Sequence, residues 1–216
     1  MNALEAQRFL GALFAPPRCS LCTGACLPAE LVCADCGRRL EGAGPGAAPL
    51  PGVGPVSWAA TYEGVARELV GALKFQGRLG LATVAAAAIA AALPAGLDGS
   101  TVVAVPAAPL RRRRRGFDPA ETIALALADR LGLPLARPLA RSQGRRQVGR
   151  RRAERRRSPP RVWTVSAIPQ RVLLVDDVLT TGATLASCAE ALRAGGCAEL
   201  RAAVFARALG RGCGAA

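Results

Sequence analysis

The chain has 216 residues, of which 51% are hydrophobic, and a formal net charge of +14 from 29 basic and 15 acidic residues. This length suits one ordinary domain with a small appendage, and the composition excludes a wholly disordered chain. Histidine is absent, which excludes Ser-His-Asp triads, imidazole general bases and histidine-bound metals. The charge excess indicates anionic partners such as phosphates or nucleic acid.

The first segment, MNALEAQRFLGALFAPP, has no basic region before its short apolar patch, so it does not resemble a secretory signal. We therefore expect a cytoplasmic protein. The longest apolar stretch, Leu81 to Leu93, falls well short of the roughly 18 to 20 residues that cross a bilayer. No membrane span is expected.

Two CxxC pairs, Cys19/Cys22 and Cys33/Cys36, follow this segment. This spacing lets both thiolates of a pair face one ion, so the four cysteines predict a tetrahedral zinc site. With every position taken by thiolate, the zinc would be structural. Two disulfides or a redox centre are the alternatives, which a cytoplasmic location disfavours. Cys26 lies between the pairs, and its role stays open.

Composition divides the chain into three parts. We expect an N-terminal helix and the zinc module in residues 1–45, a flexible Gly/Pro-rich linker in residues 46–55, and the main domain in residues 56–216. In chain order, the main domain predicts strands over 57–62, 100–106, 133–140, 161–166, 171–177 and 199–208, and helices over 63–77, 81–93, 119–131 and 183–196. Asp118 would cap the third helix, and Gly132 would end it.

Strands and helices alternate through this domain, which predicts an α/β fold with a parallel sheet covered by helices on both faces. Ligands of such sheets bind at the carboxyl ends of the strands. RVLLVDDVLTTGAT, residues 171–184, lies at one of these ends.

In this stretch, a strand ends in two acidic residues and a Thr/Gly-rich loop begins the next helix. Backbone N–H groups, hydroxyls and the helix dipole make such a loop suitable for a phosphate. Asp176 and Asp177 would repel a phosphate, so we expect them to contact sugar hydroxyls or Mg²⁺. Two acids after a strand alone would favour a helix cap or a solvated turn, but the Thr-Thr-Gly-x-Thr continuation favours a phosphorylated sugar.

VLLVDDVLTTGAT resembles the binding motif of type I phosphoribosyltransferases, which bind phosphoribosyl pyrophosphate. The order of LFAPPRCSLC, YEGVARELVGALKFQGR, VAVPAAPLRRRRRGFD and QVGRRRAERRR resembles the ComF family over nearly the whole chain. The resemblance implies a type I phosphoribosyltransferase-like sheet behind a zinc-ribbon-like module. It also implies that Asp176 and Asp177 hold the ribose hydroxyls, and that the 5′-phosphate lies against Val178, Leu179, Thr180, Thr181, Gly182, Ala183 and Thr184.

The resemblance further implies a diphosphate loop at Pro106, with Arg115 and Gly116 in its RGF core and Arg115 acting with the two aspartates in catalysis. Family members usually continue this core with Asn-Gln, whereas Asp118-Pro119 stands here, so contacts from those amides are not expected. A hood over the site would span residues 142–157.

For an enzyme, the implied reaction displaces pyrophosphate from the anomeric carbon of the ribose, with Mg²⁺ and arginine neutralising the leaving group. The chain offers no evident base and no amino-terminal glutaminase, and the acceptor is not encoded in any motif. A sensor that binds phosphoribosyl pyrophosphate without turnover would use the same residues.

A different function is a non-catalytic adaptor that binds single-stranded DNA during DNA uptake, with a helicase as partner, as the ComF resemblance suggests. Its binding residues would lie in the arginine run, at Arg150, Arg151, Arg152, Arg155 and Arg156. Trp163 is the only aromatic residue near this run, so little base stacking is expected. A solvated charged surface is the alternative interpretation of the run.

Overall fold

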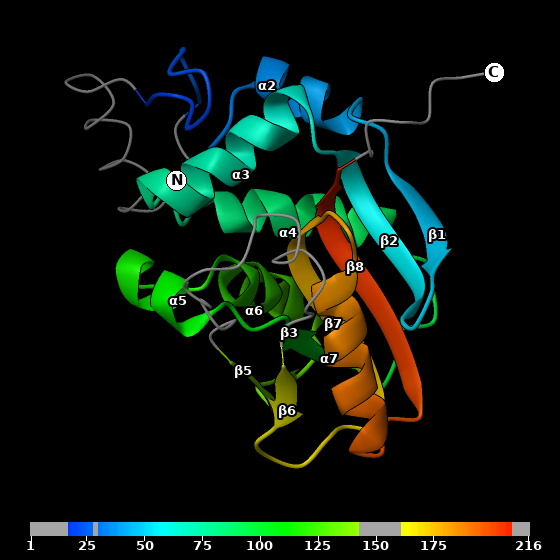
Figure 1. The fold of residues 1–216 in the computed structure, drawn as a ribbon. Coiled ribbons are helices and arrows are strands. Elements are labelled where there is room, and N and C mark those ends of the chain that lie inside the picture. Colours follow the sequence, from blue (N-terminus) through cyan, green and yellow to red (C-terminus); the bar gives the residue numbers. More distant parts are fainter. Residues whose placement is uncertain (1–16, 28–29, 143–160, 209–216) are drawn as a thin grey trace, which may run out of the picture.

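The computed structural model describes residues 17–27, 30–142 and 161–208 (Figure 1). The expected N-terminal helix, nearly all of the hood, and Arg150, Arg151, Arg152, Arg155 and Arg156 lie outside the described residues.

A six-stranded sheet forms the centre of the molecule. Its order is β1-β2-β8-β7-β3-β4, and every neighbouring pair is parallel except β1 and β2. The strands are β1 (Gly46–Leu50), β2 (Gly54–Thr61), β3 (Thr101–Ala104), β4 (Leu135–Ala136), β7 (Arg171–Leu179) and β8 (Glu199–Arg207).

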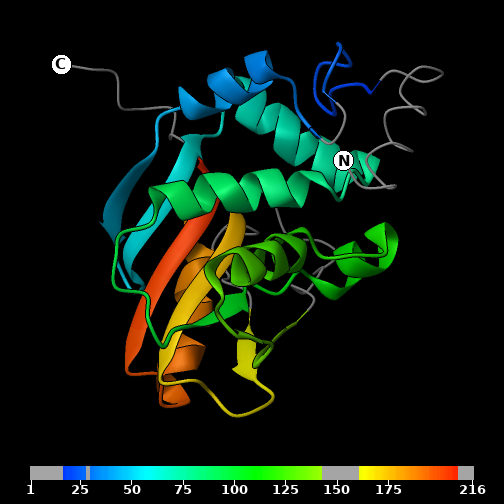
Figure 2. The same ribbon diagram turned by 180° about the vertical axis from the view of Figure 1, so that it is seen from behind.

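Helices cover both faces of this sheet, as the sequence predicts. Figure 2 shows α4 (Leu81–Ala92) and α6 (Pro119–Leu131) in front of the sheet, with α3 (Gly64–Gln76) above them. Figure 1 shows α7 (Ala183–Ala194) on the opposite face. Two apolar cores result, one between the sheet and α3, α4 and α6, and one beneath α7. The expected α/β class with a mostly parallel sheet is confirmed.

Local sequence explains most of these elements. Leu185, Cys188, Ala189 and Leu192 share one face of α7 and are buried against the sheet. Asp118 caps α6 by accepting a hydrogen bond from the backbone N–H of Ala120, and Gly132 ends the helix in a left-handed conformation. The helix α5 (Pro109–Arg115) is an addition, because the arginine run was not expected to be helical.

The prediction of a flexible linker over residues 46–55 is corrected by the structure. Gly46–Leu50 form β1, which pairs in antiparallel register with β2 from Gly46 opposite Trp58 to Leu50 opposite Gly54. Glycine and proline suggested a connector, but an edge strand tolerates both, since its outer side needs no N–H partner. The segment is therefore part of the sheet.

The single strand expected over residues 133–140 is two strands. Pro138 interrupts it, because proline has no N–H to donate and restricts the residue before it. β4 stays in the main sheet, whereas β5 (Leu139–Arg141) pairs with β6 (Val162–Thr164) in a separate two-stranded sheet.

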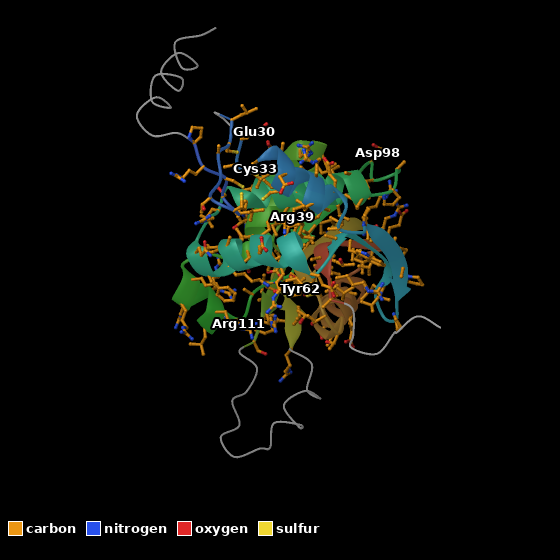
Figure 3. The ribbon with its side chains drawn as sticks, turned by 90° about the horizontal axis from the view of Figure 1, so that it is seen from above. Glu30, Cys33, Arg39, Tyr62, Asp98 and Arg111 are labelled. Carbon is orange, nitrogen blue, oxygen red and sulfur yellow. The ribbon has the colours of Figure 1, made fainter. Side chains whose placement is uncertain are left out.

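The cysteine module, with the helix α2 (Ala34–Glu41), packs on α3 and α4. Cys19 and Cys36 are buried in the same core as these two helices. Leu31 lies next to Gly80, where an added Cβ would come within 3.2 Å of its Cδ2, and the Arg78 guanidinium donates a hydrogen bond to the carbonyl of Ser20. Figure 3 labels Cys33 on one side of α3 and Tyr62 and Arg111 on the other. No helix among the described residues is long and apolar enough to span a membrane.

Candidate functional site

The candidate site lies at the carboxyl ends of β3 and β7. From β7 the sheet continues to β8 on one side, and from β3 it continues to β4 on the other. The loops after these two adjacent strands therefore diverge to opposite sides, which opens a crevice between them. Both loops that the sequence marks as ligand-binding, after β3 and after β7, begin at this crevice.

The loop after β7 forms a small pocket of about 30 Å³, here called the loop pocket. It is lined by residues that the sequence assigns to phosphate binding: Val178, Leu179, Thr180, Thr181, Gly182, Ala183 and Thr184, together with Asp176 and Leu185. The amino terminus of α7 begins directly after Gly182, so backbone N–H groups of its first turn have no partner within the helix.

Gly182 is required by the geometry of this loop. Its φ of +76° lies in the left-handed region, which residues with a side chain rarely adopt. A Cβ there would also lie 2.7 Å from Cδ2 of Leu50. Leu50 belongs to β1, so the segment expected as a linker packs against the loop pocket.

Asp176 and Asp177 stand next to this pocket, where strand alternation sends them to opposite faces of the sheet. The backbone N–H of Asp177 donates to Asp176 Oδ1 at 2.8 Å. Burial and the charge of Asp177 raise the pKa of Asp176 well above its ordinary value. Asp177 points toward α3, where its Oδ1 lies 2.7 Å from Nζ of Lys74.

A larger cavity of about 280 Å³ adjoins the loop pocket and is here called the sheet-edge cavity. Four cations and three carboxylates line it: Lys74, Arg111, Arg115, Arg141, Asp118, Asp176 and Asp177. The rest of the lining is Tyr62, Val105, Pro106, Ala107, Ala108, Pro119, Ala120, Val178, Thr180 and Thr184. Arg111 and Arg115 reach it together, because positions four apart share one face of α5.

Asp118 joins the loop after β3 to the start of α6. Its Oδ2 accepts the backbone N–H of Ala107 at 2.7 Å, and its Oδ1 accepts that of Ala120 at 3.1 Å. The residue is only 6% exposed, and burial raises the pKa of its carboxyl group. The departure from the Asn-Gln pattern therefore places a buried carboxylate beside the expected diphosphate loop.

The structure places the remaining predicted site residues as follows. Pro106 and Arg115 line the sheet-edge cavity, and the Arg115 guanidinium lies 5.3 Å from the ring centre of Phe75. Gly116 lines neither pocket; it ends α5 with a φ of +79°, directly after Arg115.

Several residues that line the sheet-edge cavity were not predicted from the sequence. Arg141 was one of many arginines, and no local pattern set it apart. Its Nε is buried and has no hydrogen-bond partner within the described part of the chain. Burial lowers the pKa of Arg141, but a guanidinium stays charged at neutral pH. Lys74 could have been noticed, because it is the only lysine in the chain.

The four cysteines of the two CxxC pairs come together as expected. The Sγ atoms of Cys19, Cys22, Cys33 and Cys36 all lie within 4.8 Å of one another, and those of Cys22 and Cys33 are 3.6 Å apart. Two thiolates on one tetrahedral zinc ion lie about 3.8 Å apart, given Zn–S bonds of about 2.3 Å. The arrangement can therefore hold one metal ion.

The thiols differ in their surroundings. Burial raises the pKa of Cys19, but hydrogen bonds donated by the backbone of Cys22, Cys33 and Leu21 outweigh it and lower the pKa to about 6. Such hydrogen bonds favour the thiolate that a metal needs. Cys26 is outside the cluster, with its Sγ 3.4 Å from the carbonyl of Glu30.

The structure is a mostly parallel α/β sheet flanked by helices, with an acid pair and a Thr/Gly loop at the carboxyl end of β7. Residues 114–213 match the family model of the phosphoribosyl transferase domain. This segment includes α6, β7, the loop pocket, α7 and β8. No curated protein matches the chain.

Similar solved structures carry related names. They include orotate phosphoribosyltransferase from Aeropyrum pernix, with 23% identity and a TM-score of 0.39 over 65% of this chain and 64% of that one. Glutamine phosphoribosylpyrophosphate amidotransferase from B. subtilis, in complex with ADP and GMP, has 21% identity and a TM-score of 0.38 over 59% and 25%. UMP synthase from Leishmania donovani has 19% identity and a TM-score of 0.36 over 66% and 24%. The matches span less than two thirds of each of these chains.

Proposed function

We propose that the protein binds phosphoribosyl pyrophosphate with magnesium and transfers the phosphoribosyl group to an acceptor. One observation carries the proposal: the loop pocket and the sheet-edge cavity share Asp176, Val178, Thr180 and Thr184. A phosphate site, two carboxylates and a cation-lined cavity therefore follow one another without a gap. This order corresponds to the 5′-phosphate, the ribose hydroxyls and the diphosphate of one ligand.

Each part of the site would have a separate role. Backbone N–H groups and hydroxyls of residues 180–184 would bind the 5′-phosphate, which the α7 dipole favours. Asp176 and Asp177 would accept hydrogen bonds from the ribose hydroxyls. Arg111, Arg115 and Arg141 would surround the diphosphate, since guanidinium groups match the geometry of phosphate oxygens.

In the reaction, the bond between the anomeric carbon and the diphosphate oxygen breaks, and a bond from that carbon to the acceptor forms. Pyrophosphate leaves with the electron pair of the broken bond. The transition state is positive at the ribose and gathers negative charge on the leaving group. The two carboxylates and the three guanidinium groups would stabilise these opposite charges.

Magnesium fits this site by the chemistry of its donors. Carboxylate and phosphate oxygens are the ligands that Mg²⁺ prefers, and three carboxylates line the cavity. When bound with the diphosphate, the ion would neutralise part of the charge on the leaving group.

The test is calorimetric titration of the zinc-loaded protein with magnesium phosphoribosyl pyrophosphate. We expect micromolar binding by the unmodified protein and a loss of more than about 100-fold in an Asp176→Asn, Asp177→Asn double variant, because several charge-assisted hydrogen bonds are removed. An Asp98→Asn, Asp129→Asn double variant is the matched control, because it removes the same charge from exposed positions. Absence of binding by the unmodified protein would refute the proposal, and pyrophosphate release with candidate acceptors separates an enzyme from a sensor.

The cysteine module supports a more specific family assignment. We propose that its metal is a structural zinc, because four thiolates would leave no position for water. The module and the order of motifs support membership of the ComF family. All cysteines among the described residues are free thiols, which suits a reducing cytoplasm.

Single-stranded DNA binding during DNA uptake, with a helicase as partner, is the second candidate. Two observations favour it: Arg113 and Arg114 are exposed on α5 and line neither pocket, and Trp163 on β6 is 47% exposed. Backbone phosphates and a stacking base are the groups that these side chains recognise. We expect a band shift on single-stranded DNA that weakens with salt and with alanine at Arg150, Arg151 and Arg152. Binding that ignores salt or these substitutions would exclude it.

A further inference from the structure

Lys74 stands apart from the other basic residues. It is the only lysine among 29 basic residues, and it lies on α3, outside the segment that matches the phosphoribosyl transferase model. Its Nζ lies 2.7 Å from Asp177 Oδ1, across 103 residues of sequence. The two side chains are only 19% and 12% exposed. The most enclosed ion pair among the described residues therefore includes one of the two site aspartates.

We propose that Lys74 is a positioning residue, which fixes the Asp177 carboxylate so that its free oxygen can accept a ribose hydroxyl. This inference rests on the proposed function. In the described part of the chain, Lys74 is the only group that donates to the side chain of Asp177. Without it the carboxylate would be buried, uncompensated and free to rotate. With it, one oxygen is held and the other remains for the ligand.

The backbone around Lys74 is held on both sides. The next residue, Phe75, lies beneath the guanidinium of Arg115 at the cavity rim. Arg78, four residues after Lys74, donates a hydrogen bond to the carbonyl of Ser20 in the cysteine module. The Arg78 hydrogen bond ties the carboxyl end of α3 to the cysteine module, close to the turn from which Lys74 reaches Asp177.

Lysine suits this place better than the arginine used elsewhere in the chain. An ammonium group is compact and carries three donors, so one can bind Asp177 while the others face the cavity that Lys74 also lines. A guanidinium is planar and wider, and would spread its five donors over the space where the sugar is expected.

A purely structural ion pair is the competing explanation. Burying two charges costs desolvation free energy, and such pairs often contribute little net stability compared with apolar residues of similar size. A fold-stabilising role would affect unfolding without any dependence on the ligand. A positioning role would affect ligands that carry a ribose more than ligands that lack one.

The experiment is a double-mutant cycle with Lys74→Met, Asp177→Asn and the double variant. Calorimetry measures the affinity for ribose 5-phosphate and for magnesium pyrophosphate. We expect Lys74→Met to weaken ribose 5-phosphate binding about 10- to 100-fold, as expected for a charge-assisted hydrogen bond. Pyrophosphate binding should change less than about threefold. The double variant should bind ribose 5-phosphate as Asp177→Asn does, because a residue that acts only through Asp177 has no further effect once that carboxylate is gone.

Two further variants complete the design. Arg171→Met is the matched control, because it breaks an ion pair with Glu199 at the opposite end of β7 and should leave both affinities unchanged. Lys74→Gln retains a hydrogen-bond donor and replaces Lys74→Met where the latter does not fold.

The outcomes separate the inference from the proposed function. No binding of either ligand by the unmodified protein refutes the proposed function, and the inference with it. If that protein binds both, the inference alone fails in three cases: unchanged ribose 5-phosphate affinity in Lys74→Met, an equal loss for pyrophosphate, or additive effects in the double variant.

Discussion

Asp118 offers the sharpest test of how the loop after β3 is held. Replacement by alanine removes the N-cap of α6, worth about 1 kcal/mol, and leaves the part-buried N–H of Ala107 without its partner, at a cost of about 1 to 3 kcal/mol. We therefore expect Asp118→Ala to lower the free energy of unfolding by about 2 to 4 kcal/mol. Urea unfolding at pH 7 measures it.

Asp118→Asn removes the charge but keeps only one of the two hydrogen bonds, because the two N–H groups are accepted by different carboxylate oxygens and the amide nitrogen of asparagine cannot accept. The pH dependence of its stability, rather than the absolute value, therefore reports on the buried charge. Because burial raises the pKa of Asp118 in the folded protein, the stability linked to its protonated form is complete below the ordinary value of 3.8. That stability is lost as pH rises through the folded pKa. The stability of the Asn variant should therefore increase relative to the unmodified protein as pH rises above 3.8.

Two results would refute this reasoning. A loss below about 1 kcal/mol in Asp118→Ala would show that neither bond matters for stability. If the stability of Asp118→Asn fell relative to that of the unmodified protein as pH rises, burial would not disfavour the carboxylate. Magnesium pyrophosphate titrations of the same variants would show whether the hydrogen bonds of Asp118 also affect ligand binding at the expected diphosphate loop.

Three further outcomes are expected. Zinc chelation should lower the melting temperature of the whole protein by about 10 °C, followed through tryptophan fluorescence, because two of the cysteines share a core with α3 and α4; an unchanged value would contradict this. Gly182→Ala should lower the free energy of unfolding more than Gly132→Ala. Gly132 has a φ of +65° and no atom near an added Cβ, so its replacement should cost about 1 kcal/mol, whereas a Cβ at Gly182 would also meet Leu50. Equal losses in urea would disprove the contact. Asp176→Asn should gain stability relative to the unmodified protein as pH rises above 3.8, because burial and the adjacent charge raise the pKa of that carboxyl group. A difference in urea unfolding that does not change with pH would argue against it.

The sequence predicts the elements whose local pattern and packing agree. α7 was predictable because its apolar face, at positions 185, 188, 189 and 192, is the face that the sheet buries. β7 was predictable because an unbroken apolar run is typical of a strand with both faces covered. The loop between β7 and α7 was predictable because its glycine and hydroxyl residues lie close together in the sequence.

Other parts were not predictable, because long-range contacts decide them. β1 exists because it pairs with β2, and no apolar alternation in GAAPL indicates this. α5 had local signals, with Pro109 at its start and Gly116 at its end, but five consecutive arginines concealed them. Lys74 and Asp177 are far apart in sequence, and only the packing of α3 brings them together.

The acid pair shows why adjacent identical residues can have different roles. Strand alternation directs Asp177 toward α3 and Lys74, whereas Asp176 faces the side of α7, where burial and its charge raise the pKa of Cys188 to about 12. The charge of Asp176 also acts on Arg141 on that side. The two carboxylates are nevertheless coupled: burial raises the pKa of Asp176, the charge of Asp177 raises it further, and the charge of Lys74 lowers it. Replacing Asp177 should therefore lower the pKa of Asp176, and replacing Lys74 should raise it.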